Sequence, residues 1–224
     1  MRRFLRENSL SLVFLLLFLA AFVGQSVAGW KDFNEKQAEH GGAAVSYGGY
    51  LLSPDFGSAL LENWQSEYLQ FALFIYLTIW LVQKGSNESK PLEHAGRESP
   101  QKQRLGGYAP PDAPRWARTG GLRTALYSNS LMLVMVAIFL GSWAGHALTA
   151  WREFNESQLE HGEARIAFVE YVRGPEFWEQ TLQNWQSEFL AVGSMAVFTI
   201  FLRQRGSPES KPVGSPHHET AASG

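Results

Sequence analysis

Two short patterns bring carboxylate and imidazole groups together, and each pattern occurs twice. The first is FNExxxEHG at residues 33–41, which returns as FNExxLEHG at 154–162. Two glutamates four residues apart share a helix face, and the next residue lies about 100° round from the second. Two such sets facing each other could ligate one divalent metal. The candidate ligands are Glu35, Glu39, His40, Glu156, Glu160 and His161.

A simpler reading of this pattern stays open. The spacing is Glu-x-x-x-Glu-His, whereas di-iron helical bundles use Glu-x-x-His. An acidic helix end in solvent, with a histidine near its C-terminus, accounts for the same residues. The chain has no cysteine, nucleotide-binding loop, nucleophile elbow or metalloprotease helix. No cofactor is expected, and nothing positive indicates an enzyme.

The second pattern, NWQSE, stands at residues 63–67 and again at 184–188, directly before an apolar run. A carboxylate at the mouth of such a run is costly in lipid and points to a function or a specific partner. One interpretation is a lock, in which each carboxylate accepts a hydrogen bond from Gln, Asn or Trp. The other is an ion path. The candidate residues are Asn63, Trp64, Gln65, Glu67, Asn184, Trp185, Gln186 and Glu188.

The elements that would position these groups are membrane helices. Four apolar runs each reach roughly the 17–25 residues that cross a hydrocarbon core once their flanks are included. Tryptophans stand at the borders of these runs, as in an interfacial belt. The predicted spans are 8–29, 65–83, 129–150 and 186–203.

The chain contains the same helical hairpin twice. A shift of 121 residues aligns 8–91 (hairpin 1) with 129–212 (hairpin 2) without a gap, and 37 of the 84 positions are identical. This predicts an all-α membrane protein of two tandem parallel hairpins, related by a pseudo-twofold axis along the membrane normal. The expected segments are hairpin repeats at 1–84 and 125–205, outer loops at 30–64 and 151–185, a flexible cytoplasmic linker at 85–124 and a disordered tail at 206–224.

The charges predict the orientation. Segments 1–7, 84–124 and 203–224 hold 14 of the 19 Lys and Arg residues, so the positive-inside rule places both termini and the linker in the cytoplasm. The first apolar run would also pass as a cleavable signal peptide. Its counterpart in mid-chain favours a retained helix.

Local patterns add finer expectations. Small residues recur four apart in the first span of each hairpin and predict a close helix–helix seam. His146 is expected to form a hydrogen bond between helices. One helix should run about 30 residues to Gly41 and another from Pro54 to about Gln83. Segments 43–52 and 164–173 are read as a short strand or extended turn. The seam residues are Ala20, Gly24, Ala28, Gly141, Gly145 and Thr149.

The doubled NWQSE, the double-hairpin plan and the repeated SxESKP ends resemble an uncharacterised family of bacterial multi-pass membrane proteins, known only as a domain of unknown function. The resemblance implies a bacterial inner (plasma) membrane location and supplies no activity. We expect a structural or interaction four-helix bundle with a small outer head. A transport or channel element using the outer carboxylates is the alternative, and a metal-dependent membrane enzyme follows. Expected partners are the lipid bilayer and an envelope protein or a second copy, with no nucleic acid.

Overall fold

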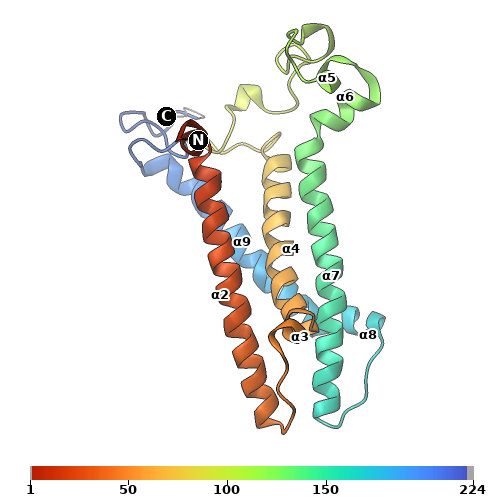
Figure 1. Ribbon diagram of the computed structural model, residues 1–224. Helices are drawn as coiled ribbons and strands as arrows, with labels where there is room; N and C mark the ends of the chain where they lie inside the picture. The colour runs from red at the N-terminus through yellow and green to blue at the C-terminus, as the bar shows by residue number, and fades with distance from the viewer. Residues whose placement is uncertain (1, 221–224) are drawn as a thin grey trace. The chain divides into compact units, whose positions relative to one another are not determined.

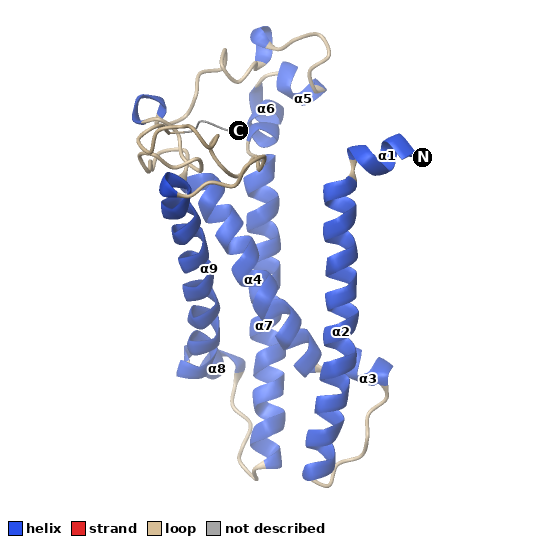
Figure 2. Ribbon diagram, turned by 90° about the vertical axis from the view of Figure 1, so that its left-hand side faces the viewer, coloured by secondary structure: helices blue, strands red, loops and turns tan. Residues whose placement is uncertain are grey.

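A computed structural model describes residues 2–220 (Figure 1). Within this range the chain forms helices joined by turns and loops, with no strand (Figure 2). This confirms the all-α prediction. The α-helices are α1 (Arg2–Glu7), α2 (Ser9–Glu39), α3 (Tyr47–Leu51), α4 (Pro54–Leu77), α5 (Arg115–Arg118), α6 (Gly121–Ser128), α7 (Ser130–Glu160), α8 (Phe168–Arg173) and α9 (Pro175–Phe201), and the 3₁₀ turns are η1 (Leu92–His94) and η2 (Gly106–Tyr108).

The chain divides into two compact units that cut across the two hairpins. Unit 1 comprises residues 1–61 and 145–177, and unit 2 comprises residues 62–144 and 178–224. Helices α4, α7 and α9 therefore contribute residues to both units, and each unit takes part of each hairpin.

In unit 1, each long helix holds the chain that follows it by the same side-chain clamp. Asn34 on α2 accepts from the backbone N–H of Val45 at 2.6 Å and donates to the Val45 carbonyl at 3.0 Å. The indole of Trp30 donates to that carbonyl at 2.7 Å. Asparagine and tryptophan can reach one residue from one helix face because they lie four apart. The clamp brings α3 beside α2 in both views (Figures 1 and 2).

The segments 43–52 and 164–173, expected to form a short strand or extended turn, form no strand: each begins without regular structure and ends in a short helix, α3 or α8. Ser46 caps α3 by accepting from the backbone N–H of Gly49 at 3.2 Å. Tyr50 is then buried against the rings of Phe33 and Phe56. A lone strand would leave its backbone groups unpaired, whereas a helical turn satisfies them locally.

The lengths of the long helices were predicted in part. Helices α2 and α7 each have 31 residues, close to the expected 30, and α4 begins at Pro54 as predicted. However, α4 ends at Leu77, six residues before the expected end. The Thr78 hydroxyl donates a hydrogen bond to the Phe74 carbonyl at 2.7 Å, and the backbone N–H of Gly96 donates to the Ile79 carbonyl at 2.6 Å. These bonds turn the chain out of the helix although the apolar sequence continues.

Two helices of the described chain, α2 and α7, are long and apolar enough to cross a membrane. The sequence predicted four such helices, and α4 and α9 do not meet the same test. Their polar residues, the NWQSE motifs among them, lower their mean hydropathy.

Candidate functional site

A cavity in unit 1 collects the repeated carboxylates and histidines. Its volume is about 430 Å³. The His40 and His161 rings, from the equivalent ends of α2 and α7, have centroids 6.5 Å apart. Each ring's Nδ1 lies within hydrogen-bond distance of the carbonyl four residues earlier, at 2.9 Å for Lys36 and 2.8 Å for Ser157. The lining residues are Phe33, Lys36, Gln37, Glu39, His40, Asp55, Glu153, Glu156, Ser157, Glu160 and His161.

The structure gives no support to a metal in this cavity. Five of the six predicted ligands line it, and Glu35 does not. Among residues 2–220, no group of three or more His, Asp or Glu side chains is arranged to hold a metal ion. The Nδ1 atoms of both histidines face carbonyls of their own helices, which turns these atoms away from a shared ligand position.

Two carboxyl groups of this cavity, Asp55 and Glu156, have a pKa raised chiefly by burial. Asp55 lies in the first turn of α4 and is half-buried. Burial raises the pKa of Asp55 above its ordinary 3.8, and the negative charge of Glu160 adds to this shift. A hydrogen bond from its own backbone N–H and the charge of Lys36 act in the opposite direction. The sequence analysis predicted a helix that begins at Pro54 and missed that the fold carries the next residue, Asp55, to the repeated glutamates.

The two NWQSE motifs meet within unit 2. Trp185 Nε1 donates to Gln65 Oε1 at 2.7 Å, and the Gln65 side chain is fully buried. Asn184 Nδ2 donates to Glu62 Oε1 at 2.6 Å. Burial raises the pKa of Glu62, and the bond from Asn184 opposes that shift. Two residues of the second motif are thus joined to α4 by directional bonds.

These bonds are not the ones that the lock predicted. Glu67 is exposed, and neither it nor Glu188 hydrogen-bonds to another group in the described chain. Positions 65 and 67 lie about 200° apart around a helix, so both cannot face α9. Glu62 lies three residues before Gln65 and shares its face.

Other members of the motifs have simpler surroundings. The hydroxyl of Ser66 bonds the Asn63 carbonyl of its own helix at 2.9 Å. Trp64 is half-buried and Gln186 is exposed. Repetition of the motif therefore does not give equivalent positions the same contacts.

Two positions of the predicted small-residue ladder, Gly145 and Thr149, lie against α4. A Cβ built on Gly145 would lie 2.8 Å from Leu61 Cδ1, so α7 and α4 approach closely there. Next along the ladder, Thr149 Cγ2 lies 2.8 Å from a Cβ built on Gly57. By contrast, a Cβ on Gly24 or Gly141 would meet no described atom within 4 Å. His146, buried beside the Phe177 ring at 5.9 Å, belongs to this face of α7.

A feature that the sequence analysis left without a role is the loop GSxESKP, which follows the second helix of each hairpin. Ser89 Oγ accepts from the Gln83 N–H at 2.8 Å, and Ser210 Oγ accepts from the Gln204 N–H at 2.9 Å. The lysines of the two loops then differ. Lys211 is buried, and its Nζ donates to the carbonyls of Gly85, Pro216, His217 and Glu219 at 2.6, 3.1, 3.1 and 2.9 Å. The repetition of GSxESKP was the signal that could have found this contact.

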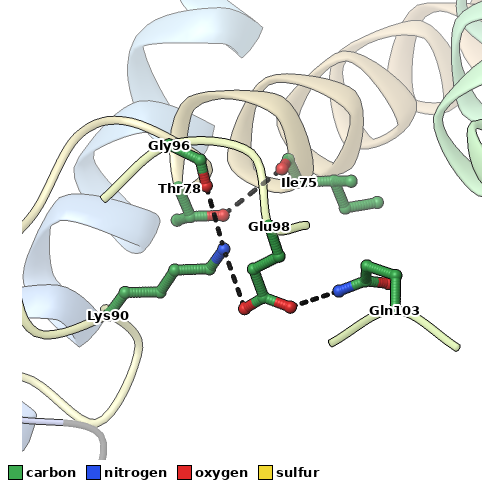
Figure 3. Close-up of polar contacts among 6 residues, drawn as sticks. All are labelled: Ile75, Thr78, Lys90, Gly96, Glu98 and Gln103. Atoms are coloured by element: carbon green, nitrogen blue, oxygen red, sulfur yellow. Dashed lines mark hydrogen bonds and ion pairs between the residues drawn. The ribbon is translucent and has the colours of Figure 1, made fainter. Parts of the chain in front are cut away.

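Lys90, the counterpart of Lys211, has looser partners (Figure 3). Its Nζ lies 3.4 Å from the Gly96 carbonyl and 3.5 Å from Glu98 Oε1. Glu98 is also bonded by the Gln103 amide. That bond first, and the charge of Lys90 second, hold the pKa of Glu98 below its ordinary value.

The described chain is all-helical, has two long apolar helices and paired polar motifs, and contains no group arranged to hold a metal. These features define a class of helical protein by its architecture, and they indicate no particular chemistry. The family model described as "Domain of unknown function (DUF6766)" matches residues 1–222. The chain belongs to that family. No curated protein and no solved structure matches it.

Proposed function

We propose that this protein is an integral membrane protein of four spans, with both termini in the cytoplasm, and that it acts as a structural or interaction element of a bacterial inner membrane. The observation that carries the proposal is the exposure of α2 and α7. Only 6% of the most apolar stretch of α2 and 17% of that of α7 is buried. Apolar surface of this extent needs a cover, and lipid provides it around the whole helix.

Long apolar helices also occur in the cores of water-soluble domains and in signal sequences, and both cases fit less well. The central helix of a water-soluble domain would be mostly buried, and neither α2 nor α7 is. A cleaved signal sequence would account for α2 alone, because α7 begins at Ser130, in the middle of the chain.

Four spans follow from the direction of the chain. Basic residues flank the beginnings of both α2 and α7, so both enter from the cytoplasm. The chain must return between them, and α4 lies there. Its 24 residues extend about 36 Å at 1.5 Å each, enough for a hydrocarbon layer of about 30 Å. The 27 residues of α9 complete the second return.

The polar groups of the NWQSE motifs support a structural role over transport. Gln65 and Glu62 are engaged by Trp185 and Asn184, within helix-pairing contacts. Hydrogen bonds between helices are a source of association in lipid, where hydrophobicity supplies none. A transport site would instead present facing polar groups along an open route.

Labelling of single cysteines tests the topology, and the native chain has no cysteine to interfere. Gly48→Cys and Val169→Cys should react with a membrane-impermeant maleimide in intact cells. Ser99→Cys and Gly214→Cys should react only after permeabilisation. All four positions are exposed. Labelling of Gly48→Cys and Ser99→Cys from the same side would overturn the four-span arrangement.

The transport alternative rests on the position of Glu67 and Glu188, the two carboxylates that stand directly before the apolar runs of α4 and α9. Protein reconstituted in sealed vesicles should pass protons and monovalent cations no faster than protein-free vesicles. A flux that is abolished in Glu67→Gln and Glu188→Gln, with unchanged thermal stability, would replace the structural role by an ion path.

A further inference from the structure

Unit 2 contains an apolar cavity between α4 and α9. Its volume is about 450 Å³. The walls include Leu73, Phe74 and Leu77 from α4 and Val192, Gly193 and Ala196 from α9. A Cβ on Gly193 would meet no described atom within 4 Å, so the absence of a side chain there keeps the cavity open.

A second cavity adjoins the first and has the opposite character. It measures about 530 Å³ and lies between the first GSxESKP loop and the tail. Lys84, Lys90 and His218 line it, so it keeps an excess of positive charge despite Glu93. Val82 lines both cavities. Figure 3 labels one residue of each cavity: Thr78, which lines the apolar cavity and follows α4, and Lys90, which lines the cationic one.

We propose that the two cavities together bind one phospholipid of the cytoplasmic leaflet. An acyl chain lies between α4 and α9, and the phosphate lies against the ammonium groups of Lys84 and Lys90. The inference rests on the proposed membrane topology, which places this end of α4 on the cytoplasmic side. It commits to a phospholipid because the apolar cavity and the cationic cavity share the wall residue Val82, and an apolar cavity beside a cationic one matches an acyl chain joined to a phosphate.

The basic side chains are available for this role. Lys84 is exposed, and its ammonium group pairs with no residue in the described part of the chain. Lys90 has only the long contacts with Gly96 and Glu98 at 3.4 and 3.5 Å. An ammonium group carries three donors, so Lys90 keeps donor capacity for a phosphate oxygen.

Hairpin 2 explains why one site is expected and not two. The residues equivalent to the polar end of the apolar cavity line a smaller cavity of about 310 Å³. Arg203 replaces Val82, and its guanidinium group bonds the carbonyls of Thr199, Ile200 and Ser215. The ammonium group of Lys211 is already hydrogen-bonded to four carbonyls. In hairpin 2, Arg203 and Lys211 therefore close the equivalent site, whereas Val82 and Lys90 leave the site in hairpin 1 open.

The test uses the purified full chain in a maltoside detergent, with thermal melting and native mass spectrometry as readouts. Phosphatidylglycerol should raise the melting temperature and bind with a stoichiometry of one. Diacylglycerol with the same chains should not, because it has no phosphate. Glycerol phosphate should not, because it has no chain. Stabilisation by glycerol phosphate alone would replace the proposal by a soluble-anion site, and equal stabilisation by diacylglycerol would remove the role of the lysines.

Matched variants locate the site. Lys84→Gln should weaken binding about five-fold, the contribution expected of one basic residue near a lipid surface. Lys102→Gln, which lies in the linker outside both cavities, should bind as the parent does. Gly193→Leu should fill the slot and lower the bound lipid, whereas Gly141→Leu, also in open space, should not. Unchanged binding in both Lys84→Gln and Gly193→Leu would overturn the proposal.

The lipid proposal and the membrane proposal fail in different ways. Extraction of the chain from membranes by alkaline carbonate would contradict the integral placement itself. A chain that resists extraction and shows the expected cysteine labelling, yet binds diacylglycerol as well as phosphatidylglycerol, would contradict the phospholipid site alone.

Discussion

Hairpin 1 and hairpin 2 hold their own connecting loops in the same way. The indole of Trp30 donates to the Val45 carbonyl at 2.7 Å, and that of Trp151 donates to the Ile166 carbonyl at 2.9 Å. The asparagine four residues later repeats its pair of bonds in each hairpin. All these bonds join residues 11 or 15 apart in the chain.

Contacts that leave a hairpin are not repeated. Gly145 packs against Leu61, whereas its counterpart Gly24 faces open space. Gln65 is buried and bonded by Trp185, whereas its counterpart Gln186 is exposed. A duplicated sequence thus fixes contacts within each copy, and the packing of the copies makes equivalent positions differ.

The asparagine clamp should give the largest effect. Asn155→Leu removes both bonds to Ile166 and leaves a backbone N–H without its partner, which should cost about 2–3 kcal/mol of unfolding free energy. Asn34→Leu should cost about the same. Thermal melting in detergent measures both. A large loss in one hairpin and none in the other would show that the clamps are not equivalent.

Glycine substitution should separate the hairpins. Gly145→Leu would place a side chain where Leu61 already lies, and overpacking of this kind costs about 1–3 kcal/mol. Gly24→Leu should change stability by less than about 0.5 kcal/mol, as at other open positions. Equal losses would mean that Gly24 also lies in a seam.

Substitution of the glutamines in the two NWQSE motifs should also affect stability unequally, with the larger loss at Gln65. Gln65→Ala leaves the indole N–H of Trp185 without its acceptor and should cost about 1–2 kcal/mol. Gln186→Ala should fall within about 0.5 kcal/mol of the parent. A double variant of Gln65 and Trp185 less costly than the sum of the single variants would establish their coupling. Strict additivity would contradict the bond.

The pH dependence should be the smallest effect and should report on Asp55. Because its pKa is raised by folding, the folded protein binds this proton more tightly than the unfolded chain does. Stability should therefore rise as pH falls through the raised folded pKa toward the ordinary 3.8. The groups facing Asp55 across the cavity are Lys36, His40, Glu153, Glu156, Glu160 and His161.

Asp55→Asn should remove that part of the pH dependence and also lessen the rise in the pKa of Glu156, which burial causes first and the charge of Asp55 second. Melting at several pH values compares the variant with the parent and with Glu35→Gln, which lies outside the cavity. A parent whose stability does not rise on acidification, or a variant with the same pH profile, would contradict the assignment.

The sequence by itself determined the helical class, a first long helix of about 30 residues where α2 has 31, and the start of α4 at Pro54, whereas the asparagine clamps were not predicted. The predicted features depend on apolar periodicity and on Pro at a helix start, both of which are local. The sequence also pointed to the residue types of the unit 1 cavity, because His40 and Glu39 recur in register.

Only the tertiary structure decided which partners those residues meet. The local pattern of segments 43–52 and 164–173 resembled strands, yet each lay beside a helix that offered no strand to pair with. The sequence pattern singled out Glu67 because it lies directly before an apolar run. In the structure, however, Asn184 donates its hydrogen bond to Glu62, which lies on the helix face that α9 contacts. The turn after Leu77 depended on Gly96, which lies 19 residues further along the chain. Such contacts are set by how helix faces and distant loops pack, and a pattern read along one chain contains no information about the facing surface.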